Sequence, residues 1–311
     1  LTGDEVITAF EHETFASFPK GNYTASSPVI SYWNTFFQGL RQCYIFLENV
    51  DKVPDLTESV KTDYIAQVKF LIAYYHYQLA RCYGPIILIK ELPDVNASQA
   101  EYLPRTSYDE CVDWICNLLD EAASSLPAIR TNKEDYGLAT SVGAKAVKAK
   151  MLLYAASPLF NGNSSFYSNF TDKSGSQLMP LTYDPNKWVK AKTAIKEAID
   201  LAEQNGHALY VKQDYKIGNE DANPYPAAGP VRCLRTSLVD WDSRNPEVLL
   251  AETRSEGSYG IQNKSLPFVT DGWAWNGVGP TWTMLNRFYT KNGLPWDEDP
   301  EYKDKDKLKI V

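Results

Sequence analysis

Apolar side chains recur at every third or fourth position along five stretches of the chain. This spacing lines one face of a helix, with polar residues on the opposite face. It predicts helices over residues 31–50, 57–82, 107–126, 140–157 and 184–205. The first two are joined by a short polar turn at Pro54-Asp55, and the next two form a second pair, so the chain is predicted to fold as helical hairpins.

Successive hairpins along one chain are typical of TPR-like stacking, in which each pair covers the apolar face of the next. No clean 34-residue repeat is visible. In the fourth helix, Ala146, Ala149, Ala155 and Ala156 allow a neighbouring helix to approach closely.

The ends of the helices carry capping signals. These are Ser107 with Glu110, Thr140 or Ser141, Asp184 with Pro185, and Asn205-Gly206. Ser107 and Glu110 have the spacing of a capping box, in which each side chain accepts from the other's backbone N–H.

Two long stretches lack the helical spacing. Residues 161–183 are rich in Asn, Ser and Gly, and residues 206–279 contain many Pro and Gly together with several Trp. A shorter sixth helix is predicted from Pro280 to Gly293. Loops this long inside a compact protein are usually functional or disordered, and their aromatic content argues against disorder.

We therefore expect a mainly α-helical fold in a single domain over residues 1–311. Within it, residues 31–205 form the TPR-like hairpins. Residues 206–311 form an irregular, loop-rich portion that faces a ligand and carries the short helix.

The net charge of −8 excludes some classes of partner. An acidic chain has no basic surface for wrapping nucleic acid or coating anionic lipid. No run of about 20 apolar residues occurs that would form a membrane-spanning helix. The five cysteines show neither CxxC nor Cys/His spacing, so neither a disulfide scaffold nor a zinc module is expected.

The sequence motifs typical of enzymes are absent or incomplete. His12-Glu13 begins like a zinc-protease motif, but Ala16 stands where the second His is required. No phosphate-binding glycine loop, dinucleotide fingerprint or nucleophile elbow is present. His76 lies among tyrosines in a predicted helix and is interpreted as a structural, hydrogen-bonded side chain, while His207 is interpreted as part of a helix end. No catalytic residue, metal or cofactor is therefore predicted.

The segment around Trp273 and Trp275 is the best candidate site. Indole rings present a broad apolar face that can stack on the C–H face of a pyranose, while Asp271 and Asn276 can bind its hydroxyls. The predicted ligand-binding residues are Trp241, Tyr259, Asp271, Trp273, Trp275 and Asn276. The alternative is that both Trp side chains anchor the loop on the core, since Trp is highly buried on average.

Several motifs resemble the SusD/RagB proteins of Bacteroidetes outer membranes. The segment WNTFFQGLRQCYIFL at 33–47 keeps Trp33, Arg41 and Leu47 of a family helix. The strongest single motif, QVKFLIAYYHYQLARCYGP at 67–85, is similar to the family's E-A-[RK]-F-L-R-A pattern, with Gln67 and Ile72 in place of Glu and Arg. Further similar segments lie at 136–140, 152–162 and 279–293.

The resemblance implies a cell-surface outer-membrane lipoprotein that binds glycans or other nutrients without cleaving them. It also implies delivery of the ligand to a SusC-like TonB-dependent transporter, against which the helical part packs. Membrane attachment would come only through a lipid anchor outside this sequence, and we expect the chain to be truncated at both ends relative to the family. Two other classes stay open: a glycoside hydrolase using a carboxylate pair, and a TPR-type adaptor that binds peptides on its helices.

Overall fold

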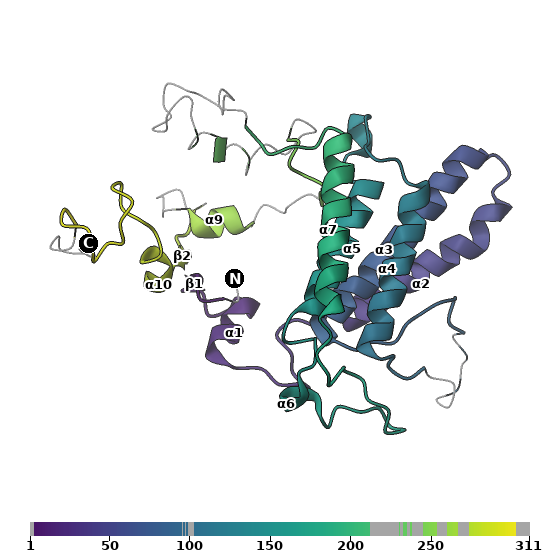
Figure 1. Cartoon of the computed structure of the whole chain (residues 1–311), viewed down its shortest axis with the longest axis horizontal. Coiled ribbons are helices and arrows are strands. Elements are labelled where there is room, and N and C mark those ends of the chain that lie inside the picture. The colour runs from purple at the N-terminus through teal and green to yellow at the C-terminus, as the bar shows by residue number, and fades with distance from the viewer. Residues whose placement is uncertain are drawn as a thin grey trace. The chain divides into compact units, whose positions relative to one another are not determined.

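The structure is a computed structural model that describes residues 3–94, 96, 98, 103–211, 230, 233, 234, 237, 245–253, 260–266 and 274–302. It divides into two compact units (Figure 1). One, here called the helical unit, comprises residues 32–253. The other, here called the small unit, joins residues 1–31 to residues 254–311.

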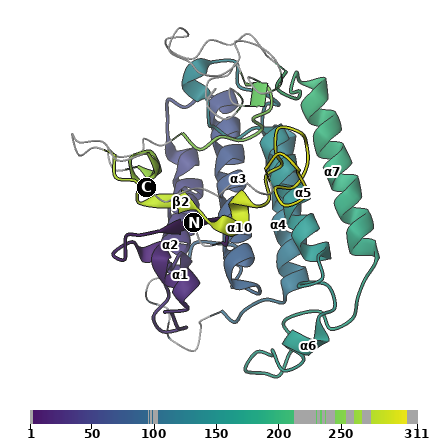
Figure 2. The same cartoon turned by 90° about the vertical axis from the view of Figure 1, so that its left-hand side faces the viewer.

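The described part of the helical unit contains five long helices. They are α2 (Trp33–Asn49), α3 (Glu58–Tyr83), α4 (Tyr108–Ser125), α5 (Ser141–Ala156) and α7 (Asn186–Gln204). Shorter pieces are α6 (Ser164–Tyr167) and the 3-10 turns η2 (Val50–Lys52) and η4 (Lys133–Asp135). Each long helix packs against the next along the chain, and the long axes lie side by side in Figure 2. The prediction of a mainly α-helical fold with TPR-like hairpins is confirmed.

The core lies between these helices. Its largest fully buried apolar side chains come from α2, α3, α4 and α5, and from the segment after α3; they include Leu40, Ile72, Leu79, Ile86, Tyr108, Ile115, Leu119 and Met151. Small residues pack α5 against α7, where Ala149 contacts Ala194 and Ala198 in a second buried cluster. The predicted close approach of a helix to the alanine face of α5 is therefore present. Of the helical cysteines, Cys43, Cys111 and Cys116 are buried free thiols, whereas Cys82 is exposed.

The helix ends follow their capping signals in part. Thr140 caps α5, since its Oγ1 accepts from the Gly143 N–H at 3.0 Å. At the end of α7, Gly206 has a φ of 86°, the Gly206 N–H donates to Glu203 O and the His207 N–H donates to Ala202 O. These two bonds form a Schellman motif, which satisfies carbonyls that the helix end leaves unpaired.

The capping box predicted at Ser107 does not form. Helix α4 does begin directly after Ser107, but the hydroxyl of Ser107 makes no capping hydrogen bond. The backbone of the next residue is held instead by a different partner, because the Tyr108 N–H donates to Leu178 O at 2.8 Å. The start of α4 is thus fixed by the loop that packs on it rather than by its own N-cap side chain.

The small unit holds short elements. They are β1 (Val6–Thr8), η1 (Thr14–Ala16), α1 (Ser17–Lys20), α9 (Ile261–Ser265), β2 (Val278–Pro280) and α10 (Trp282–Leu285). Strands β1 and β2 pair antiparallel with Ile7 opposite Gly279, which joins the two ends of the described chain. Thr281 caps α10 by accepting from the Met284 N–H at 3.2 Å.

The helix predicted from Pro280 to Gly293 is wrong in its length, since α10 ends at Leu285. Its apolar stripe is left open by the residues that the structure describes: Trp282 is 52% exposed and Phe288 57% exposed. The chain then turns around buried Asp299, whose carboxylate accepts from Thr290 Oγ1 at 2.5 Å and from Asn292 Nδ2 at 3.0 Å. Side-chain bonds to Asp299 therefore replace the backbone bonds of a helix in this segment.

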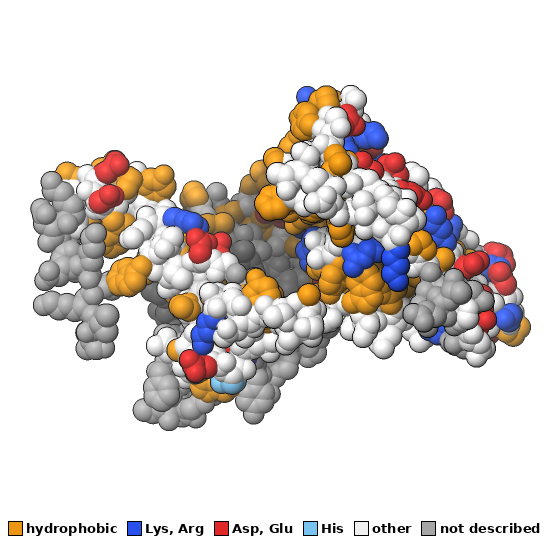
Figure 3. Space-filling model, turned by 90° about the horizontal axis from the view of Figure 1, so that it is seen from below, with side chains coloured by type: hydrophobic (Ala, Val, Ile, Leu, Met, Phe, Trp, Pro, Cys, Tyr) orange, Lys and Arg blue, Asp and Glu red, His pale blue; other side chains and the backbone are white. Residues whose placement is uncertain are grey.

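Within the described ranges, no helix combines the length and apolar character needed to cross a membrane. Hydrophobic side chains nevertheless reach the surface of the helical unit, where Figure 3 shows them gathered beside Lys and Arg side chains. Scattered apolar side chains of this kind are ordinary on protein surfaces.

Candidate ligand-binding site

The described part of the predicted site is a short loop that precedes β2. Its backbone is held by the segment at α9: the N–H groups of Trp275, Asn276 and Gly277 donate to the carbonyls of Asn263, Leu266 and Lys264 at 3.0, 2.9 and 2.7 Å. Three consecutive donors are thus satisfied by one neighbouring segment. Such a loop holds its side chains in fixed directions.

The other side of this loop is closed by β1 and the residues after it. The Gly277 carbonyl accepts from the Ala9 N–H at 3.0 Å and from Thr8 Oγ1 at 2.8 Å. The ring of Phe10 lies directly over Gly277, where a Cβ would stand 1.8 Å from the ring. Only glycine leaves room for Phe10, which in turn reaches the Trp275 indole edge to face, with 6.5 Å between ring centroids.

The two described site residues differ in exposure. Trp275 is half-buried and Asn276 is exposed. Asn276 is also in the left-handed region, with φ of 47°, which Asn tolerates better than most residues. The backbone therefore turns sharply between the indole and the amide, while the preceding Ala274 is fully buried and anchors the loop.

The remaining predicted site residues, Trp241, Tyr259, Asp271 and Trp273, lie outside the described residues. Whether they share one surface with Trp275 and Asn276 therefore stays a prediction. Near the loop, Lys264 forms an ion pair with Glu13. Across the described residues, no group of three or more His, Cys, Asp or Glu side chains is placed to hold a metal ion.

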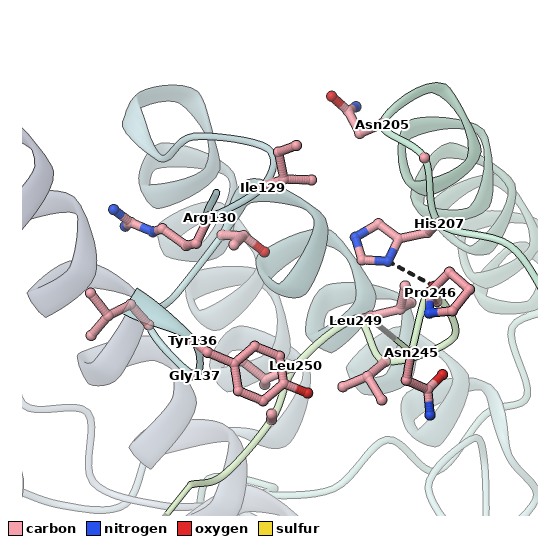
Figure 4. Close-up of a pocket in the computed structure, with 15 residues that line it drawn as sticks. Ile129, Arg130, Tyr136, Gly137, Asn205, His207, Asn245, Pro246, Leu249 and Leu250 are labelled. Atoms are coloured by element: carbon pink, nitrogen blue, oxygen red, sulfur yellow. Dashed lines mark hydrogen bonds between the residues drawn. The ribbon is translucent and has the colours of Figure 1, made fainter. Parts of the chain in front are cut away.

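A second hollow, which the sequence did not indicate, lies in the helical unit. This pocket of about 230 Å³ is formed by three segments that are far apart in the chain: residues 129–140, residues 205–207 and residues 245–251. Figure 4 shows Leu249 and Leu250 between the side of Ile129 and Tyr136 and the side of His207. We call it the α7-end pocket, because the C-terminal end of α7 forms one wall.

The walls of the α7-end pocket are fixed by hydrogen bonds. His207 Nδ1 lies 3.0 Å from Pro246 O, and the Ala208 N–H donates to the same carbonyl at 3.3 Å. Buried Asn245 donates through Nδ2 to Ser237 O at 2.9 Å and accepts through Oδ1 from the Glu247 N–H at 3.0 Å. The segments that carry the wall residues are therefore bound to each other.

Arg130, on the opposite wall, is engaged away from the hollow. Its Nη1 and Nη2 donate to the two carboxylate oxygens of Asp63 at 3.0 and 2.8 Å, and its Nε and Nη2 also donate to Ala139 O. Burial raises the pKa of Asp63, but the hydrogen bonds from Arg130 and Gln67 outweigh it, so this pKa lies below its ordinary value. The guanidinium charge is thus neutralised by a partner on α3.

His76 is structural, as its setting among tyrosines predicted. It is fully buried, with Nδ1 2.8 Å from Ile72 O and Nε2 accepting from the Ile89 N–H at 3.1 Å. Because Nε2 accepts, the proton of the neutral ring lies on Nδ1. Burial lowers the pKa of His76 to about 4. Nδ1 thus contacts a carbonyl of α3 itself, while Nε2 ties α3 to the segment after it.

Comparison with known proteins identifies the family. A SusD-like family model, described as "Starch-binding associating with outer membrane", matches residues 8–153. No curated protein matches the chain by sequence. The solved structure of BT4246 matches with a TM-score of 0.79 and 30% identity over 97% of this chain.

Two solved structures from Bacteroides fragilis NCTC 9343 share the fold. The SusD-like protein BF3747 has a TM-score of 0.67 and 21% identity over 94% of this chain, and the SusD-like carbohydrate binding protein BF0978 has 0.64 and 18% over 97%. The matches cover 54% of BT4246, 49% of BF3747 and 48% of BF0978, so the chain spans about half the length of these relatives. The family-model match, the likeness to BT4246 and the shared helical fold together show that the chain belongs to the SusD/RagB family.

Proposed function

We propose that this chain binds a glycan, or another nutrient of similar chemistry, at the cell surface and releases it unaltered. The observation that carries the proposal is the loop at Trp275 and Asn276, whose backbone is held by α9 and β1 while the amide of Asn276 is exposed. A rigid loop that offers an indole beside an amide suits a sugar ring, since rings stack on aromatic faces while amides bind hydroxyls. The description of the matching family, "Starch-binding associating with outer membrane", supports the same ligand class.

In the proposed site, Trp273 and Trp275 stack on sugar rings. Asp271 and Asn276 hydrogen-bond their hydroxyls, and Tyr259 and Trp241 extend the aromatic surface. Residues 275–277 are held by backbone hydrogen bonds before the ligand arrives, so little cost of ordering them opposes binding. The side-chain amide of Asn276 can donate and accept, which matches the mixed character of a hydroxyl.

The proposal extends to a partner and a location. A SusC-like TonB-dependent transporter of the outer membrane would receive the nutrient, and the helical hairpins would form the surface that packs against it. The chain would be held at the cell surface by a lipid anchor outside this sequence. The location is supported by the description of the matching family, which associates with the outer membrane.

A glycan array with the purified chain, followed by calorimetric titration of the best ligand, tests the proposal. The double variant Trp273→Ala with Trp275→Ala should abolish measurable binding, and Asn276→Ala should weaken it by about tenfold, as loss of about 1.4 kcal/mol would. Trp282→Ala is the matched control, because Trp282 is an exposed Trp of the same unit. Equal affinity of the double variant and the unchanged chain would overturn the site.

The same sample separates the two alternatives. A glycoside hydrolase would release reducing sugar from the glycan, which a colorimetric assay detects and which the proposal does not allow. A TPR-type adaptor would bind peptides with an affinity that the Trp273 and Trp275 variants do not change. A glycan that binds, stays intact and depends on Trp275 supports the proposed function against both.

A further inference from the structure

The α7-end pocket has features of a small-molecule site that is separate from the proposed glycan site. Its volume of about 230 Å³ exceeds the roughly 150 Å³ of an apolar cavity that holds benzene. Three of the exposed large apolar side chains of the helical unit meet there, with Ile129 42%, Leu138 40% and Leu250 36% exposed. Apolar groups that converge on one hollow lose contact with water when a ring fills it.

His207 presents a ring nitrogen to the pocket. His207 uses Nδ1 on Pro246 O, which leaves Nε2 of the neutral ring as an acceptor. Among the described residues no hydrogen bond to Nε2 is seen, and Figure 4 shows the imidazole turned toward the hollow. The Schellman motif at Gly206 and the bonds to residues 245–247 fix the direction of this ring.

The charges of the lining exclude an ionic ligand. Arg130 is neutralised by its two bonds to Asp63, and no Asp or Glu is among the residues that line the pocket. A charged group placed there would have no partner to repay its desolvation.

We propose that the α7-end pocket binds a neutral aromatic ring that carries one hydroxyl, of the phenol type. The ring packs on Ile129, Leu249 and Leu250, and its hydroxyl donates to His207 Nε2. The site is distinct from the Trp275 loop, which belongs to the small unit, so it holds whether or not the chain binds glycans.

Titration of the purified chain with phenol and with anisole, followed by protein-observed NMR, tests the proposal. Anisole has the same ring but no donor, so phenol should bind at least fivefold more tightly. Leu250→Trp should fill the hollow and weaken both probes at least tenfold. The control Leu153→Trp, on an exposed leucine of α5 outside the pocket lining, should leave both affinities within twofold.

His207→Phe keeps an aromatic ring but removes the acceptor, and it should bring the affinities for phenol and anisole within twofold of each other. The comparison of the two probes on the unchanged chain needs no variant, so it stands even if the His207 variant does not fold. Equal affinity of the unchanged chain for phenol and anisole would overturn the proposal. So would phenol binding that Leu250→Trp leaves unaltered.

Discussion

Arg130 and Asp63 form a two-bond ion pair across 67 positions of the chain, with Nη1 and Nη2 each donating to a separate carboxylate oxygen. The side chains are 12% and 26% exposed, so the pair is largely withdrawn from water. Arg130 also donates to Ala139 O, close to the start of α5. One guanidinium therefore joins α3 to the segment between α4 and α5, and its fixed position forms a wall of the α7-end pocket.

Asp63→Asn should destabilise the helical unit by about 2 kcal/mol. The substitution leaves the guanidinium without its counter-charge, and breaking a withdrawn ion pair from one side is costly. Urea denaturation followed by circular dichroism measures the free energy of unfolding. The comparable Glu121→Gln substitution removes the exposed pair of Lys69 and Glu121, and it should change that free energy by less than about 0.5 kcal/mol. Equal effects of the two substitutions would contradict the structural role of Arg130.

Protonation of His76 makes the free energy of unfolding depend on pH between about 6.5 and 4. The unfolded chain binds a proton near pH 6.5, whereas burial lowers the pKa of folded His76 to about 4. The contribution of neutral His76 to the free energy of unfolding is therefore fully present above pH 6.5. It is lost as the pH falls toward 4, and the free energy of unfolding is then lower by about 3 kcal/mol.

The free energy of unfolding of His76→Gln should vary less between pH 6.5 and 4 than that of the unchanged chain. Urea denaturation at pH 7.5, 6, 5 and 4.5 measures the two curves. Asp63→Asn is a useful comparison, because the lowered pKa of Asp63 places its loss of stability below the ordinary carboxyl range of about 3.8. Parallel curves for the unchanged chain and His76→Gln over pH 6.5 to 4.5 would show that His76 is not the titrating group.

The long helices were predictable because their determinants are local. Three- and four-residue spacing defined α2, α3, α4, α5 and α7, and Asn205-Gly206 marked the Schellman motif at the end of α7. The spacing also extended α10 too far, because periodicity records which face is apolar but not whether another element covers that face. Trp282 and Phe288 have the right spacing and remain exposed.

The candidate sites depend on contacts that spacing does not record. The Trp275 loop was found from its composition, but its support by Phe10 joins positions 265 residues apart, a relation that no local signal carries. The α7-end pocket was missed because its walls come from three separate segments. Each segment by itself has the sequence features of a loop or of a helix end and does not indicate a binding site. His207 was placed correctly at the end of α7, yet nothing in the sequence near it indicates Pro246 as the partner of its ring.

The N-caps of α5 and α4 offer a direct comparison of two residues that the sequence marks as helix caps. Thr140→Ala should lower the free energy of unfolding by about 1 kcal/mol, because the Gly143 N–H loses its acceptor. Ser107→Ala should cost only a few tenths, because its hydroxyl makes no capping bond. Thermal and urea denaturation of both variants would measure the difference. A larger loss from Ser107→Ala would mean that the capping box forms after all.

Gly277→Ala should weaken glycan binding without unfolding the helical unit. The added methyl would stand 1.8 Å from the Phe10 ring, so Phe10 must leave its place beside the Trp275 indole. The Trp275 indole then loses the ring that supports it, and titration calorimetry should show an affinity for the glycan at least fivefold lower. Gly279→Ala, two residues along the same segment with nothing within 4 Å of its Cβ position, is the matched control and should bind normally.

Adding Phe10→Ala to Gly277→Ala removes the clash but not the loss of support, so the double variant should fold as well as the unchanged chain and still bind weakly. Full affinity in the double variant would show that Phe10 does not position Trp275 for the ligand.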